Sequence, residues 1–192
     1  MPDEPRQVHL DARQIRVLAH PLRARLLAQL RYDGPATATR LAEVLGTNTG
    51  ATSYHLRQLA EVGLVLEDER ARRGRERWWR AAHDVSVWSR DAYADDPDAM
   101  AAADWLNSYA ARGLASQVEA WHRAAAREPA EWRAAADFSD YILTLNAEQL
   151  AALTKELDAV IERHRRQTAA APAPDARQVL LYLYSLPRPE QS

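Results

Sequence analysis

Residues 46–65, GTNTGATSYHLRQLAEVGLV, constrain what this chain can fold into more than any other stretch. Gly46 is the residue type that ends many helices, and Asn48 is a good N-cap for a following helix. An amphipathic helix is therefore expected over about 49–61, with small polar residues at its start and Gly63 at its end. A helix of this kind, entered through a short turn, has the shape of one that lies in a DNA groove.

The segments on either side of this stretch predict a simple order of elements. Three helices are expected before it, over about 8–19, over about 21–32, and from Thr37 or Thr39 to Leu45. Two strand-like runs follow it, at 64–70 and 75–82, and Gly74 supplies the turn between them. The sequence therefore predicts four helices followed by a β-hairpin.

Three pieces of this region carry a resemblance to a known family. They are LAHPLRARLLAQL (18–30), ATATRLAEVLGTNTGATSYHLRQLAEVGLV (36–65) and EDERARRGRERWWRA (67–81). In this order and spacing they resemble the winged helix-turn-helix of ArsR-type bacterial transcription factors, over residues 19–83. The resemblance implies a DNA-binding domain over residues 8–83, mainly α-helical with a β-hairpin wing, that binds double-stranded DNA as a homodimer.

One face of the helix over 49–61 is expected to meet DNA. Leu56, Leu59 and Ala60 lie on its inner side. The residues expected to project the other way are Thr49, Ser53, Tyr54 and Arg57. Short hydroxyls and an Arg suit base edges and phosphates in a major groove, and the resemblance implies contacts at the first three of these residues. His55 is open between a phosphate contact and a packing residue.

The expected hairpin is rich in arginine. Over residues 70–77 it carries Arg70, Arg72, Arg73, Arg75 and Arg77. Arg72 and Arg73 flank Gly74 at the expected tip, and with Arg75 they are expected to grip backbone phosphates or to straddle a minor groove. The alternative is a solvated charge run, because acidic residues lie close by in the sequence. These are Glu67, Asp68, Glu69 and Glu76.

Composition limits the other classes of function. The whole chain has a net charge of −2, but residues 1–85 carry +3 and the remainder −5. Cys is absent, and no second His lies near the His83–Asp84 pair, so no metal site is expected. Catalytic motifs are also absent, so neither an enzyme nor a cofactor is expected. With no apolar run of 18 residues, a soluble, cytoplasmic protein without membrane contact is expected.

Residues 84–192 are expected to form a second region, for dimerisation and ligand sensing. Its expected elements are a long helix over 98–127, a strand over 138–145, a helix over 147–166 and a strand over 177–186. The long helix and the helix over 8–19 are candidates for the dimer contact, because the family pairs through its terminal helices. The expected apolar seam consists of Leu106, Tyr109, Gly113, Leu114, Val118 and Trp121.

Large aromatic residues gather after the hairpin. Trp88, Trp105, Tyr109 and Trp121 form a candidate pocket for a small hydrophobic or aromatic ligand, because their flat rings suit such molecules. The alternative is that these rings pack the second region or the dimer interface. For the whole chain, a homodimeric transcriptional regulator such as a repressor is expected. The alternative is a winged-helix protein–protein interaction or assembly module without specific DNA binding, which the near-neutral net charge leaves open.

Overall fold

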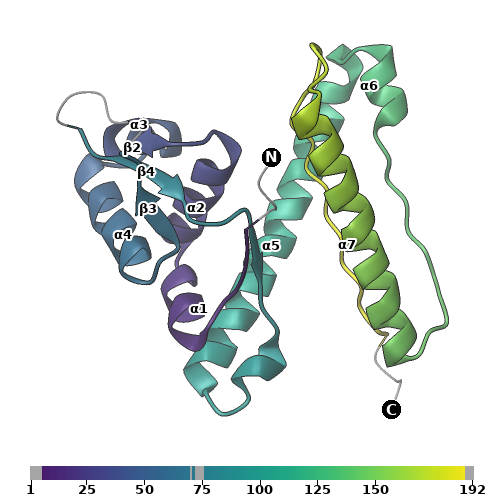
Figure 1. The fold of residues 1–192 in the computed structure, drawn as a ribbon, viewed down its shortest axis with the longest axis horizontal. Coiled ribbons are helices and arrows are strands. Elements are labelled where there is room, and N and C mark those ends of the chain that lie inside the picture. The colour runs from purple at the N-terminus through teal and green to yellow at the C-terminus, as the bar shows by residue number, and fades with distance from the viewer. Residues whose placement is uncertain (1–5, 70, 72–75, 189–192) are drawn as a thin grey trace. The chain divides into compact units, whose positions relative to one another are not determined.

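The structure, a computed structural model, describes residues 6–69, 71 and 76–188 of the 192-residue chain (Figure 1). These residues divide into two compact units, an N-terminal unit that ends at Arg112 and a C-terminal unit that begins at Gly113. The long helix α5 contributes to both units. Each unit is described by itself below.

The N-terminal unit is a group of helices with two small sheets. Its helices are α1 (Ala12–Leu18), α2 (Pro21–Tyr32), α3 (Ala38–Leu45), α4 (Thr49–Glu61), the 3₁₀ helix η1 (Arg90–Tyr93) and the first part of α5 (Pro97–Ala124). Its strands are β1 (Gln7–His9), β2 (Ala36–Thr37), β3 (Val65–Glu67), β4 (Trp78–Ala81) and β5 (Val85–Val87). The expected mainly helical fold with a β-hairpin and a long following helix is confirmed.

Local signals in the sequence explain where most of these helices begin and end. The helix expected over 21–32 and the helix expected over 49–61 both have those bounds in the structure. Pro21 occupies a first-turn position in α2, where its missing N–H is tolerated. Gly46 has a φ of 63°, which favours glycine, and it ends α3 with its N–H directed to the carbonyl oxygens of the last turn.

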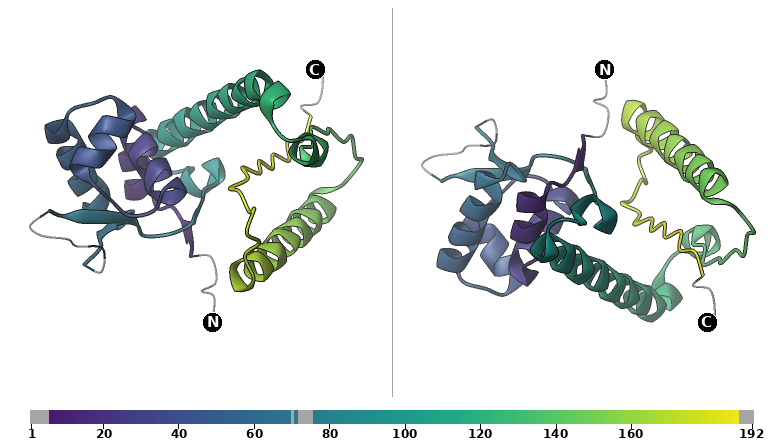
Figure 2. Two further views of the ribbon diagram at one scale, coloured as in Figure 1. Left: turned by 90° about the horizontal axis from the view of Figure 1, so that it is seen from above. Right: turned by 90° about the horizontal axis from the view of Figure 1, so that it is seen from below.

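The predicted hairpin is present as part of a three-stranded antiparallel sheet. β4 is the central strand, between β2 and β3, and Trp79 lies opposite both Ala36 and Glu67. The sheet lies along one side of the helices of this unit (Figure 2). The paired strands are shorter than the expected runs at 64–70 and 75–82.

A second pairing was not expected from the sequence. β1 and β5 form a parallel pair in which Val8 lies opposite Ser86. The helix predicted over 8–19 is therefore wrong at its beginning, since α1 starts only at Ala12. Asp11 caps α1 through a capping box with Gln14, which sets that start.

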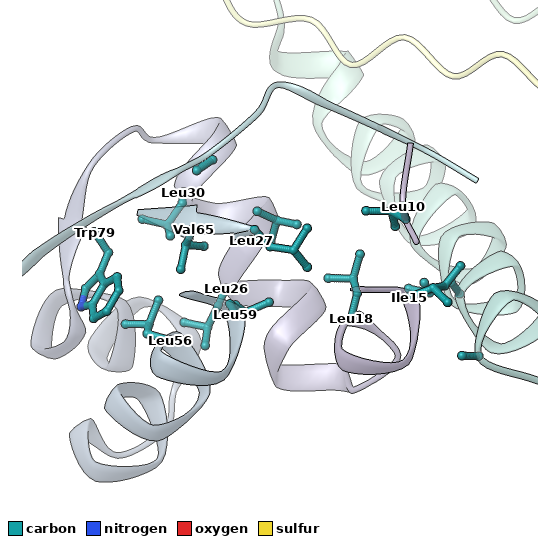
Figure 3. Packing of buried hydrophobic residues seen from close by; sticks show 14 of the residues in the cluster. Leu10, Ile15, Leu18, Leu26, Leu27, Leu30, Leu56, Leu59, Val65 and Trp79 are labelled. Atoms are coloured by element: carbon teal, nitrogen blue, oxygen red, sulfur yellow. The ribbon is translucent and has the colours of Figure 1, made fainter. Parts of the chain in front are cut away.

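One hydrophobic core holds the N-terminal unit together (Figure 3). Leu26, Leu56 and Leu59 from α2 and α4 are fully buried beside Val65 and Trp79 of the sheet. Leu106 of α5 belongs to the same buried cluster. The prediction that Leu106 forms part of a dimer seam is therefore wrong, because its side chain is used inside its own chain.

The C-terminal unit contains the rest of α5 and three further helical segments. These are the 3₁₀ helix η2 (Ala125–Arg127), α6 (Ala130–Ala135) and α7 (Ala147–Ala170). The long helix expected over 98–127 is confirmed, with its last residues in η2. The helix expected over 147–166 is present and extends to Ala170, and Asn146 caps its start through a capping box with Gln149.

The prediction of strands at 138–145 and 177–186 is wrong for the single chain that the structure describes. Both segments lie within the described part of the chain, and neither is paired as a strand there. Their alternating apolar residues suit a pleated strand, but a strand also requires a neighbouring strand to pair with its backbone. The C-terminal unit is therefore helices joined by extended segments rather than strand, helix and strand.

Among the helices that the structure describes, none combines the length and the apolar character needed to span a bilayer.

Candidate nucleic-acid interface

The helix pair α3–α4 is fixed by hydrogen bonds at the turn between its two members. Thr47 donates its N–H to the carbonyl oxygen of Ala42, at 2.9 Å, which closes the end of α3. The side chain of Asn48 accepts a hydrogen bond from the N–H of Ala51 at 2.8 Å, which caps the start of α4. Arg25 of α2 donates to the carbonyl oxygen of Leu45 at 2.9 Å and so joins a third helix to the turn. These three hydrogen bonds fix the turn at the start of α4 to α3 and α2.

The two sides of α4 differ in the way the sequence predicts. Leu56 and Leu59 are fully buried, and Thr52 is buried with its hydroxyl donated to the carbonyl oxygen of Asn48. On the other side Thr49 and Arg57 are exposed, Ser53 is half-buried, and Tyr54 is 52% exposed. The structure therefore places these four predicted residues on a face of the helix that the core does not use.

The first turn of α4 contains a glycine next to its capping side chain. A Cβ atom at Gly50 would lie only 3.3 Å from Oδ1 of Asn48, so a larger residue there would require that side chain to shift. The N–H groups of Thr49 and Gly50 come before the first intrahelical hydrogen bond and lie at the positive end of the helix dipole. A phosphate oxygen suits such a position.

His55 packs against other side chains rather than standing free. Its ring lies 4.5 Å from the ring of His20, the N-cap residue of α2, and 5.1 Å from the ring of Tyr54. Its Nδ1 atom is buried and has no hydrogen-bond partner among the described residues. Burial is the main cause that lowers the pKa of His55, and His20 and Arg23 lower it further. An uncharged His55 that packs beside Tyr54 follows from this arrangement.

Sequence reasoning missed the contribution of α2 to this site. Arg23 donates to the carbonyl oxygen of Val17 and lies close enough to lower the pKa of His20, after the larger effect of burial. The side chain of His20 accepts the N–H of Leu22 at 3.2 Å. The only signal in the sequence was the HPLR segment itself, which the resemblance included without assigning these contacts.

The predicted wing is described only at its base. Arg72, Arg73 and Arg75 lie outside the described residues, as does Arg70. Arg77 forms an ion pair with Glu67 at 3.1 Å and lies over the ring of Trp79 at 5.8 Å. The side chain of Arg77 is therefore engaged within its own hairpin.

The four aromatic residues of the predicted ligand pocket fall into separate arrangements. Trp105 and Tyr109 stack on α5 with ring centroids 5.0 Å apart. Trp88 donates its Nε1–H to Oδ1 of Asn107 at 3.0 Å. Trp121 belongs to the C-terminal unit. A pocket formed by all four residues stays a prediction.

Of the His83–Asp84 pair, weighed above as metal ligands, His83 is buried, and Asp84 is exposed and accepts the N–H of Arg6 at 3.0 Å. His83 is 1% exposed, and its Nε2 atom lies 2.8 Å from Oγ of Ser86. Arg31 donates to the same Ser86 oxygen at 2.7 Å and to the carbonyl oxygen of His83 at 3.2 Å. In the described part of the chain, no group of three or more His, Asp or Glu residues is placed to hold a metal ion.

Comparison with known proteins identifies the same region. Residues 18–68 match a family model described as a helix-turn-helix domain. The chain is 43% identical over 61 residues to the HTH-type transcriptional regulator NmtR of Mycobacterium tuberculosis, a match that covers 32% of this chain. The chain spans 50% of the length of that relative.

Solved structures with weak overall similarity include two DNA-binding proteins. A winged helix-turn-helix DNA-binding domain from Mycobacterium bovis, solved as a homodimer, is 26% identical; the match covers 43% of this chain and 68% of that one, with a TM-score of 0.33. ZitR of Lactococcus lactis in complex with DNA is 18% identical; the match covers 82% of this chain and 77% of that one, with a TM-score of 0.27.

Proposed function

We propose that this chain, which carries an ArsR-like winged helix-turn-helix domain in its N-terminal unit, is a sequence-specific DNA-binding transcriptional regulator that acts as a homodimer. Its operator would be an inverted repeat, with α4 in the major groove of each half-site and the wing over the adjacent backbone. Binding would then occlude a promoter or change its geometry.

The observation that carries this proposal is the division of α4 into a buried and a free side. Leu56 and Leu59 fix the helix to the core, whereas Tyr54 and Arg57 are exposed on the opposite side. Hydroxyl, phenol and guanidinium groups on one side of a rigid helix are suited to base edges and phosphates.

Binding to DNA can be tested without knowledge of the operator. The chain is expected to shift bulk genomic DNA fragments at low salt and to release them as salt rises, because phosphate contacts displace counterions. Selection of bound fragments at higher salt is then expected to enrich one inverted repeat. Failure to bind DNA at any salt concentration would favour a protein–protein interaction or assembly module instead.

The wing is proposed to contact DNA through Arg72, Arg73 and Arg75. The combined change of Arg72→Ala and Arg73→Ala is expected to weaken binding and to lower its salt dependence, since two cations are lost near phosphates. Arg123→Ala with Arg127→Ala is the matched control, because it removes two charges from the C-terminal unit. Equal effects of the two pairs would remove the wing from the interface.

A small organic ligand is proposed to control DNA binding through the aromatic residues after the wing. The stacked, half-buried pair Trp105 and Tyr109 supports this, because two parallel rings offer a flat surface to an aromatic molecule. Tryptophan fluorescence in the presence of a panel of hydrophobic compounds tests it, with Trp105→Phe to identify the responding ring. A panel that leaves the fluorescence of the chain unchanged would argue for packing alone.

A further inference from the structure

Two segments of the C-terminal unit expose an unusual amount of apolar surface. Residues 138–145 and 177–186 flank α7 in the sequence, and both lie outside the helices and strands of the structure. Ile142 is 87% exposed and Leu186 is 82% exposed. The other exposed large apolar residues of the two segments are Phe138, Tyr141, Leu143, Leu145, Val179, Leu180, Leu181, Leu183 and Tyr184. Exposed patches of this kind usually mark an interaction surface.

Each segment is held in place at an end. The ring of Phe138 lies 6.4 Å from the ring of His122 on α5, and Asn146 after the first segment caps α7. Arg177, which starts the second segment, forms an ion pair with Glu128 at 2.7 Å and lies over the ring of Trp132 at 4.9 Å. Their own chain therefore contacts each segment at an end, while the eleven large apolar residues named above stay exposed.

Two aromatic rings of the second segment are arranged as they would be in a strand. The rings of Tyr182 and Tyr184 lie nearly parallel, with an angle of 14° between them and their centroids 6.4 Å apart. Side chains two residues apart face the same side of an extended chain, as they do in a β-strand. The segment belongs to neither of the two sheets that the structure describes.

The charges of the two segments point to a second copy as the missing neighbour. Asp140 is the only charged residue in 138–145, and Arg177, which pairs with Glu128, is the only one in 177–186. A charged partner would have few opposite charges to bind in these segments. An apolar strand can instead pair with the same strand of a second copy across a two-fold axis. Burial of one large apolar side chain removes roughly 60–120 Å² from water, so eleven partly exposed ones offer on the order of 700–1,000 Å². A stable interface needs about 800 Å² from each partner.

We propose that residues 138–145 and 177–186 are strands of the dimer, which pair with the same segments of a second copy of this chain. The inference rests on the proposed homodimer and adds a C-terminal interface to it. Pairing between two copies would also bury the alternating apolar residues of both segments, which are exposed in a single chain.

The test measures self-association of the full chain by sedimentation equilibrium. Leu181→Glu combined with Leu183→Glu is expected to weaken the dimer roughly tenfold or more, because the interface would then hold four unpaired charges. Ala151→Glu with Ala152→Glu, at exposed positions of α7, adds the same charges and is expected to leave the dimer unchanged. Circular dichroism is expected to show the same helix content in both variants.

Hydrogen exchange provides a second measurement that does not depend on any variant. Amides of 138–145 and 177–186 are expected to be protected at concentrations where the chain is dimeric and to lose protection on dilution. Protection at every concentration would show pairing within one chain and overturn the proposal, as would no protection at any. A dimer that Leu181→Glu with Leu183→Glu does not weaken would overturn this interface alone, whereas a wild-type chain that stays monomeric would overturn the homodimer as well.

Discussion

The imidazole rings of His20 and His55 lie 4.5 Å apart, so the N-cap of α2 supports the side chain next to Tyr54 on α4. His20 has two roles in this contact, since it also accepts the N–H of Leu22. Burial lowers the pKa of both rings, which keeps the pair uncharged near neutral pH. The exposed side of α4 is therefore connected to α2 by a packed pair of neutral rings.

Replacement of His20 separates its two roles. His20→Asn keeps a side chain that can cap α2 but removes the ring, and His20→Ala removes both. The Ala variant is expected to be about 1 kcal/mol less stable than the Asn variant, which is the usual contribution of a cap. Urea unfolding measures this difference, and equal stability of the two variants would contradict a capping role.

The same His20→Asn variant makes a prediction about His55. The neighbouring His20 contributes to the lowered pKa of His55, so its removal is expected to raise that pKa toward 6.5. An NMR titration of the His55 ring measures the change. A lower pKa of His55 in this variant would show that His20 does not lower the pKa of His55 in the wild-type chain.

Arg57 is expected to be a contact to DNA rather than part of the fold. Arg57→Ala is predicted to lower affinity for operator or genomic DNA by roughly tenfold and to reduce the salt slope by about one, with little change in stability. Gln58→Ala is the neighbouring control, because Gln58 hydrogen-bonds Glu61 at 3.1 Å within α4. Comparable losses of DNA affinity in both variants would mean that the helix, and not the guanidinium, is affected.

The sequence predicted those elements of the structure that depend on short-range signals. α2 and α4 have the predicted bounds because their caps and stop residues lie next to them in the sequence. The exposed side of α4 was predicted for the same reason, since helical spacing alone separates Arg57 from Leu56 and Leu59.

Features that depend on distant residues were not predicted. β1 pairs with β5, whose residues lie 78 positions later, and nothing near Gln7 indicates that partner. His20 and His55 are likewise far apart in the sequence. At 138–145 the alternating pattern predicted a strand that the described chain does not form, because a strand also depends on a neighbouring strand that the pattern does not specify.

His83 is expected to make the stability of the N-terminal unit depend on pH. Burial, followed by the charge of Arg31, lowers its pKa from 6.5 to about 4. Between these values the unfolded chain binds a proton that the folded chain does not, so stability is predicted to fall as the pH falls from 6.5 to 4. The full loss is about 3 kcal/mol.

The His83→Gln variant isolates this contribution. It lacks the titrating ring, so the stability difference between wild type and variant is expected to narrow by about 3 kcal/mol from pH 7 to pH 4. Urea unfolding across this range measures it, with His9→Gln as a control at an exposed position. A difference that stays constant with pH would show that His83 titrates at its ordinary value.

Tyr93 is expected to hold the β1–β5 pair to the start of α5. Its buried hydroxyl donates to the carbonyl oxygen of Leu10 at 2.6 Å, and the N–H of Leu10 donates to the carbonyl oxygen of Val87 at 2.9 Å. Tyr93→Phe keeps the ring and removes only the donor, which leaves a buried carbonyl without this partner. The variant is predicted to be about 1–3 kcal/mol less stable. Tyr54→Phe, where the ring is exposed, is predicted to cost far less, and equal effects in urea unfolding would argue against a structural role for the Tyr93 hydroxyl.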